Sequence, residues 1–169
     1  MTVWFSSDHH FGHRNIISYC NRPFRSVEGM NESFIRWWNH DVQPDDTIYY
    51  LGDLSFLSQE ATDKILQRLQ GHIHFVKGNH DREWKSNRID TIQQELCVEV
   101  EGQPIHLTHK PLDNWWLRKE GSWHLHGHLH GNSHHDKFKL PRRIDVGVDV
   151  WNYRPVSFQE IKEEFSGQK

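Results

Sequence analysis

The sequence predicts a mixed α/β domain, and three observations lead to this fold class. In the first half, short runs of β-branched and aromatic residues alternate with amphipathic helical patterns. In the second half, strand-like runs follow one another directly. Many of the runs also stop at a short cluster of Asp, Asn or His. This order predicts a mixed sheet arrangement rather than a purely parallel, doubly wound one.

The bulk properties fit one soluble domain over residues 1–169. The 169 residues are 35% hydrophobic and 25% charged, and no linker or repeat divides them. The net charge of −3 and the pI near 6.6 argue against a strong nucleic-acid-binding surface, but leave a nucleotide substrate open. The count of 15 His is high, so their positions must decide what they do.

The expected compartment is the cytoplasm. No apolar run reaches the length of about 18 residues that predicts a membrane helix, and the N-terminus lacks the pattern of a secretory signal. Cys20 and Cys97 are isolated and match no metal or redox spacing, so we expect two inert, buried or half-buried thiols. The oligomeric state is left open.

The first half predicts three strands and two helices. The strands are Thr2 to Ser6, Thr47 to Leu51 and Ile73 to Val76. Asn31 is a candidate cap for a helix that continues to about Asp41. Ser58 is a candidate cap for a helix that carries apolar residues as far as Leu69.

The second half predicts mostly strands. Leu96 to Val100 and Pro104 to Thr108 form an expected hairpin, followed by strands at Trp123 to His126 and Arg143 to Val148. Ser157 and Glu160 match a capping box, which predicts a last helix to about Phe165.

Five of the predicted strands end in residues that bind metals. Ligands of open α/β sheets bind beyond the carboxyl ends of the strands, so five such loops can converge on one place. A single His is usually a core or surface residue, and the joint pattern is what indicates a site. The clusters are Asp8 and His10; Asp53; Asn79, His80 and Asp81; His109; and His128 and His130.

The spacing within these clusters suits a shared cavity. Asp8 and His10, like His128 and His130, are two residues apart, which places both side chains on one side of an extended segment. Gly52, Gly78 and Gly127 each precede a cluster, and glycine permits a sharp turn and close backbone approach. Carboxylate oxygen and imidazole nitrogen are typical metal ligands.

In this order, the five motifs resemble those of the calcineurin-like metallophosphoesterases, and the chain is similar in length to their small bacterial or phage-type members. The motifs span Asp8 to His130, and every motif matches in residue type. The resemblance implies a sandwich of two mixed β-sheets flanked by helices. It also implies two divalent ions, with manganese favoured and iron, zinc or nickel as alternatives.

The resemblance also divides the ligands between the two ions. Asp53 would bridge both of them, a natural place for a carboxylate because two neighbouring cations repel. Asp8, His10 and His130 would bind the first ion, and Asn79, His109 and His128 the second.

The implied reaction is hydrolysis of a phosphate ester. A metal-bridging hydroxide would attack phosphorus in line with the leaving oxygen. His80 follows Asn79 and cannot point the same way, so we expect it to protonate the leaving alkoxide. The family comparison supports this role, and Asp81 would orient His80.

Several other residues are candidates for substrate contact. Arg22 and His13 are candidates near the first motif, and Lys110 near His109. The segment from Leu112 to Trp123 holds three Trp, which either stack on a base or pack as a lid or core, with packing slightly favoured. His134 and His135 either support the ligands or bind metal adventitiously, and the basic run from Lys137 to Arg143 is expected to be a solvated loop, with phosphate steering as the alternative.

The expected function is therefore a phosphodiesterase acting on a small, nucleotide-like substrate. A phosphomonoesterase or a nuclease uses the same metal chemistry, although a nuclease lacks support from the charge. A non-catalytic metal-binding or partner-binding scaffold is the alternative from a different class, and a His-rich metal buffer is another.

Overall fold

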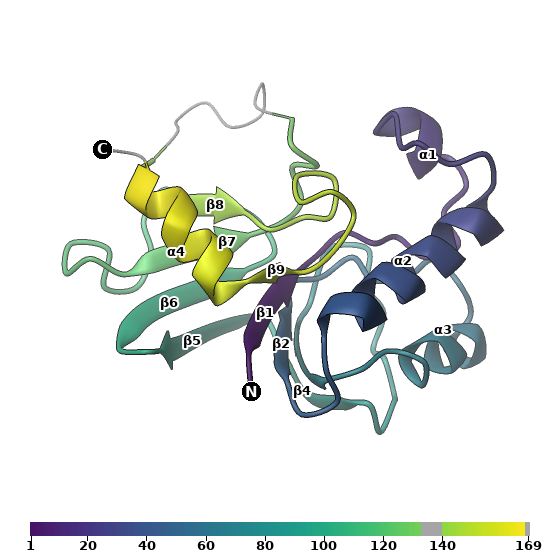
Figure 1. The fold of residues 1–169 in the computed structure, drawn as a ribbon, viewed down its shortest axis with the longest axis horizontal. Coiled ribbons are helices and arrows are strands. Elements are labelled where there is room, and N and C mark those ends of the chain that lie inside the picture. Colours follow the sequence, from purple (N-terminus) through teal and green to yellow (C-terminus); the bar gives the residue numbers. More distant parts are fainter. Residues whose placement is uncertain (133–139, 168–169) are drawn as a thin grey trace.

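The computed structural model describes residues 1–132 and 140–167, so His134, His135 and residues 137–139 of the basic run lie outside the described residues. In these ranges the chain forms four helices and nine strands (Figure 1). The helices are α1 (Ile16–Tyr19), α2 (Val27–Asp41), α3 (Gln59–Leu66) and α4 (Phe158–Gly167). The strands are β1 (Val3–Ser6), β2 (Thr47–Tyr50), β3 (His72–Val76), β4 (Ile89–Gln93), β5 (Glu95–Val100), β6 (Gln103–Thr108), β7 (Trp123–His126), β8 (Arg143–Asp145) and β9 (Val156–Ser157).

The strands form two mixed sheets, as the family resemblance implied. The first sheet has the order β4-β3-β2-β1-β9, in which β1 to β4 are parallel and β9 is antiparallel to β1. The second has the order β5-β6-β7-β8, with an antiparallel β5–β6 pair and parallel pairing from β6 to β8. The two sheets and their flanking helices form a sandwich.

Two hydrophobic cores hold the layers together. In the first, α2 and α3 cover one face of the first sheet through buried residues such as Phe34 and Leu66, which pack near Tyr50 and Phe75 (Figure 1). In the second, residues of both sheets pack with α4; Trp123 of β7 stacks on Phe158. The alternation of each strand thus divides its side chains between two layers.

Most predicted elements are present, with shifted bounds. The helix expected from Asn31 begins at Val27, because Ser26 is the N-cap and accepts a hydrogen bond from the Gly29 amide. Asn31 lies inside the helix and accepts from the Gly12 amide. The strand expected from Arg143 to Val148 ends at Asp145.

The C-terminal capping box is confirmed. The Ser157 amide and hydroxyl both donate to the Glu160 carboxylate, and the Glu160 amide donates back to the Ser157 hydroxyl. The chain also forms β4, β9 and the short helix α1, which were not predicted. Strands of two to five residues and a four-residue helix give too little pattern for periodicity to detect.

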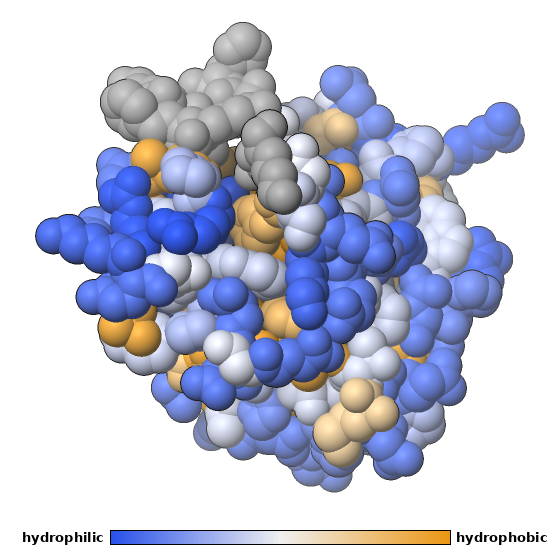
Figure 2. All heavy atoms as spheres, turned by 60° about the vertical axis from the view of Figure 1, so that its left-hand side comes forward, coloured by the Kyte–Doolittle hydropathy of each residue, from blue (hydrophilic) through white to orange (hydrophobic). Residues whose placement is uncertain are grey.

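The surface agrees with the composition. The face in Figure 2 is mainly hydrophilic, and its hydrophobic side chains lie in separate spots. Across the described ranges, none of the helices has the length and apolar character needed to cross a bilayer. Both thiols are free; Cys20 is half-buried as expected, whereas Cys97 is exposed on β5, where the prediction of burial was wrong.

Candidate metal centre

Backbone pairing beyond the strand ends brings the first two motifs together. The amides of Asp8, His10 and Phe11 donate to the carbonyls of Gly52, Asp53 and Leu54, at 3.0, 3.1 and 2.8 Å. The two loops thus continue the β1–β2 pairing past the sheet. The Gly127 amide donates to the His109 carbonyl in the same way, which joins the loops after β6 and β7.

The seven predicted ligands form two neighbouring clusters. One contains Asp8, His10 and His130, and the other contains Asp53, His109 and His128; one candidate ligand atom per residue lies within 4.8 Å of the others in its cluster. The Asn79 side-chain oxygen lies 3.0 Å from Nε2 of His109, which adds Asn79 to the second cluster. Chain segments up to about 120 residues apart therefore meet at one edge of the sandwich.

One carboxylate oxygen lies between the clusters. Oδ2 of Asp53 is 3.6 Å from Nε2 of His10 and 3.4 Å from Nε2 of His109. Its other oxygen, Oδ1, accepts a hydrogen bond from the His80 amide at 2.9 Å. Asp53 is thus held in the orientation that a bridging ligand requires.

The first cluster is buried and has unpaired acceptor atoms. Asp8 is fully buried, and its Oδ2 accepts from the Ser7 hydroxyl and the His128 amide. Its Oδ1 and both ring nitrogens of His10 have no hydrogen-bond partner among the described residues. Buried polar atoms without a partner cost free energy, and a cation between them removes that cost.

The distances between these atoms fit metal ions. Nε2 of His10 and Nε2 of His130 lie 3.7 and 3.9 Å from Oδ1 of Asp8. An ion held at about 2.0–2.2 Å by nitrogen and oxygen ligands places those ligands about 3–3.5 Å apart. Asp8, His10 and His130 therefore fit one divalent ion after a small contraction.

Hydrogen bonds behind the cluster orient the imidazoles. Nδ1 of His109 donates to the Leu51 carbonyl at 2.7 Å, and Nδ1 of His130 donates to Asp149 at 2.7 Å. In each ring, the remaining Nε2 is directed at a carboxylate of the site. Such hydrogen bonds fix the tautomer that a metal needs.

The site also shifts the pKa values of its groups. Burial opposes ionisation of Asp8, but the nearby imidazoles of His10, His109 and His130 hold its pKa well below the usual range. Burial disfavours protonated His130, but Asp149, Cys20 and Asp8 raise its pKa to about 10. A metal that binds Nε2 of His130 must displace the proton that this nitrogen carries in the protonated imidazole.

Five of the ligands have an unusual backbone conformation. Asp8, His10, Asp53, His128 and His130 all have φ between 50° and 73°. Non-glycine residues rarely adopt this left-handed region, and such strain concentrates at functional sites. The surrounding loop-to-loop hydrogen bonds maintain it.

All three flanking glycines are required by close packing, as predicted, and a Cβ at Gly52 would collide with the backbone of Gly78. A Cβ at Gly78 would collide with Asp53, and a Cβ at Gly127 would collide with Ser7 and Asp8. Any larger residue at either of these last two positions would displace a predicted metal ligand, Asp53 or Asp8.

Comparison with known proteins agrees with this geometry. The profile of the calcineurin-like phosphoesterase superfamily domain matches residues 1–146. The chain belongs to the calcineurin-like phosphoesterase superfamily. Members of this superfamily generally hydrolyse phosphate esters and bind divalent metal ions.

Relatives of this superfamily domain occur in an archaeon and in phages. An uncharacterized protein of Methanocaldococcus jannaschii is 40% identical over 165 residues, covering 94% of this chain and 88% of the relative. The gene 66 protein of Mycobacterium phage L5 is 28% identical over 191 residues, covering 94% and 91%. The crystal structure of a protein of unknown function, AQ665 of Aquifex aeolicus, aligns with a TM-score of 0.76 and 27% identity, covering 96% and 98%.

His80 lies at the edge of the superfamily site and outside both ligand clusters. Its side chain is exposed, and its ring centroid is 5.8 Å from that of His10. Asp81 was predicted to orient His80, but its carboxylate is hydrogen-bonded elsewhere. Its carboxylate accepts from the amides of Asp53, Leu54 and Gly78 and from the Trp84 indole, so it shapes the loops instead.

The prediction that Arg22 contacts substrate was wrong. Its guanidinium is buried, donates to both oxygens of Asp149 at 2.8 Å, and also donates to the carbonyls of Asp8 and His9. With a further contact to Met30, its donors are used within the protein. Arg22 thus holds the first motif and, through Asp149, His130.

Asp149 is the residue that the sequence prediction missed. It follows the apolar stretch from Val146 to Val148. A polar residue at the end of such a stretch is the same signal that predicted the ligands. The stretch does form buried backbone pairing, because the Val148 amide donates to the Ser7 carbonyl. This pairing places Asp149 beside the first motif, where it accepts from Nδ1 of His130.

His13 lies beside the first cluster, with its ring 5.8 Å from that of His10. Burial and the neighbouring charges of His10 and His80 lower its pKa, so it brings little positive charge to a phosphate. Trp115 and Trp123 are buried, and Trp116 is 42% exposed. Trp115 and Trp123 therefore pack within the protein, which is the alternative that the sequence slightly favoured over stacking on a base.

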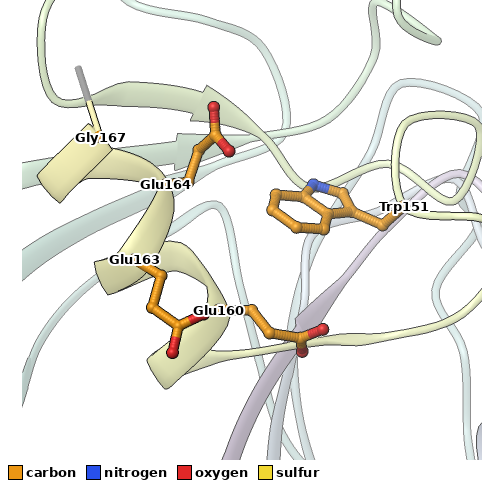
Figure 3. A pocket seen from close by; sticks show the side chains of 5 residues that line it. All are labelled: Trp151, Glu160, Glu163, Glu164 and Gly167. Atoms are coloured by element: carbon orange, nitrogen blue, oxygen red, sulfur yellow. The ribbon is translucent and has the colours of Figure 1, made fainter.

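A hollow elsewhere does not suit a phosphate. It lies between α4 and Trp151, and Glu160, Glu163 and Glu164 line it (Figure 3). Glu160 is already paired with Arg154. The carboxylates repel anions, so this hollow is excluded as the phosphate site.

Proposed function

We propose that this protein is a phosphodiesterase that uses two divalent ions, manganese favoured, to hydrolyse a small nucleotide-like phosphate ester. The observation that carries the proposal is Oδ2 of Asp53, which lies within 3.6 Å of a histidine nitrogen of each cluster. A carboxylate so placed is suited to be shared between two cations. The cytoplasm remains the proposed compartment.

The proposed ligands divide between the ions as the family pattern implies. Asp8, His10 and His130 would hold one ion, Asn79, His109 and His128 the other, and Asp53 both. When bound, such a pair of ions lowers the pKa of water and stabilises both the attacking and the leaving oxygen of an in-line displacement.

The chain itself would supply the proton for the leaving group. His80 is exposed beside the clusters, and its backbone is fixed by the amide hydrogen bond to Asp53. Its imidazole is therefore free to turn toward an alkoxide at the open side of the site. General acids of this kind contribute about 10²–10⁴-fold to a rate.

The test is hydrolysis by the Mn²⁺-loaded protein and two variants. Wild type should cleave bis-p-nitrophenyl phosphate and a 2′,3′-cyclic nucleotide. Asp53→Asn should lose metal and all turnover, whereas His80→Ala should keep metal and lose about 10²–10⁴-fold with the cyclic nucleotide, whose leaving group is poor. Metal content by atomic emission separates the two effects.

Two results would contradict the proposal. Stoichiometric metal uptake with no turnover of any ester would favour a metal buffer or a non-catalytic scaffold. Full activity of His80→Ala on the cyclic nucleotide would remove His80 from the reaction.

A phosphomonoesterase is the second candidate, and one cation favours it. Lys110 is exposed, lines a hollow with Asn79 and His109, and is close enough to lower the pKa of His128 after burial and His109. Its ammonium would pair with the second negative charge of a monoester. A higher kcat/KM for p-nitrophenyl phosphate than for the bis ester, lost in Lys110→Ala, would identify this activity.

A further inference from the structure

Four aromatic side chains form a continuous row beside the first ligand cluster. The row contains Tyr19, His13, Phe56 and His80, and we call it the ring row. The rings of His13 and Phe56 are stacked, with centroids 4.2 Å apart and planes within 14°. Tyr19 lies 6.2 Å beyond His13, and His80 lies 5.2 Å beyond Phe56.

The ring row touches the metal centre. The Phe56 ring lies 5.4 Å from that of the predicted ligand His10, with 25° between the planes. Its backbone is fixed, because the Phe56 amide donates to the Phe11 carbonyl and the Phe11 amide to the Leu54 carbonyl. The Phe56 loop therefore has a defined position relative to Asp53.

Three rings of the row are exposed: those of Tyr19, Phe56 and His80. Phe56 is 40% and Tyr19 is 72% exposed, although burial of a large aromatic ring normally stabilises a protein. The interior therefore leaves these rings available at the surface. Exposed aromatic side chains next to a site commonly serve recognition.

Tyr19 lies at the end of the row that borders a hollow beside the predicted ligands. It lines a hollow of about 510 Å³ together with Cys20, Asn132 and the predicted ligands His128 and His130. A group attached to a phosphate at the metal centre would have the ring row along one side. The row offers flat faces and edges rather than a deep pocket.

We propose that the ring row binds a nucleobase of the substrate by stacking, which makes a mononucleotide ester the substrate class. This inference rests on the proposed function, because the phosphate at the metal centre places the base. A flat ring matches the exposed rings in shape, and stacking tolerates any base. The net charge of −3 favours a small ester over a polyanionic strand.

The test compares two ligands that differ only in the base. Adenosine 5′-phosphate and ribose 5-phosphate are titrated into the metal-loaded protein by calorimetry. Wild type should bind the adenosine ligand about tenfold more tightly, since one stacked base contributes about 1–3 kcal/mol. Phe56→Ala should abolish that preference and leave the Kd of ribose 5-phosphate unchanged, and Phe56→Tyr should retain it.

Ile92→Ala is the matched control. Ile92 is 37% exposed on β4 and outside the ring row, so its loss should leave both Kd values unchanged. Equal wild-type Kd values for the two ligands would overturn the inference. An equal loss for both ligands in Phe56→Ala would also overturn it, because it would mean a general disturbance of the site.

Turnover of bis-p-nitrophenyl phosphate by the same preparation keeps the two proposals separate. Turnover without a base preference leaves the phosphodiesterase standing and rejects the stacking site. A base preference that depends on Phe56, without turnover of any ester, supports the stacking site and rejects the enzymatic function.

Discussion

The same spacing, His-x-His, occurs twice in succession, with different outcomes. His124 and His126 lie within β7, and His128 and His130 follow directly after the strand. All four are separated by single residues. In the first pair, His124 stacks on Trp115 and its ring lies 5.5 Å from that of His126, whereas the second pair lies in the candidate metal centre.

His124 is satisfied by its own surroundings. Its Nδ1 donates to the His106 carbonyl at 3.1 Å, its Nε2 accepts from the Leu112 amide at 3.0 Å, and its ring stacks on Trp115. Burial, with the neighbouring His126 and Arg143 as smaller causes, lowers its pKa to about 3. A neutral imidazole with both nitrogens used has no lone pair left for a metal.

His130 has the opposite arrangement. Asp149 accepts from Nδ1, and Nε2 is left facing Asp8. Positive φ at His128 and His130 turns the chain away from the strand direction and toward the first motif. The difference teaches that alternation identifies the histidines, but that the end of the strand decides which of them face the metal.

The largest expected effect separates the two pairs directly. His130→Ala should lose one equivalent of metal and reduce kcat/KM by at least about 10³-fold, since two-metal chemistry supplies most of the rate. His124→Gln, which keeps a donor and an acceptor, should stay within about twofold of wild type. Metal content and ester hydrolysis measure both, and similar losses in the two variants would contradict the distinction.

A smaller effect is expected behind the ligand. Asp149→Asn should weaken metal binding by about 10–100-fold, because a neutral amide accepts a weaker hydrogen bond from His130 and no longer makes the ring more basic. Asp113→Asn is the control, since Asp113 is an exposed partner of Arg143 outside the centre. Competition with a fluorescent chelator measures the affinity; an unchanged affinity in Asp149→Asn would mean that packing holds His130 without it.

The smallest expected effect is a pH-dependent loss of the free energy of unfolding, and it is caused by His124. Because burial lowers its folded-state pKa to about 3, the unfolded chain binds the proton first as the pH falls below 6.5. His124 should therefore cost about 2 kcal/mol of unfolding free energy between pH 7 and pH 5. His124→Gln should lack this loss in urea denaturation of the metal-free protein, and an identical pH slope would show that the ring is protonated in the fold.

Much of the centre was predictable because its chemistry is local in sequence. Each group of predicted ligands lies just beyond the end of a strand, and the parallel strands carry those ends to one edge. The division of roles was less predictable. Arg22 and Asp81 were expected to act on substrate or on His80, but their donors and acceptors are used by residues such as Asp149 and by loop amides.

The sequence by itself determined the mixed α/β class, the ligand residue types and their order, because periodicity and strand-end chemistry depend on near neighbours. Only the tertiary structure decided that Asp53 lies between two clusters, that Asp149 supports His130, and that Phe56 stands exposed beside them. These facts depend on distances between segments far apart in the chain. Packing of two sheets, with strained loops held by each other's amides, fixes those distances.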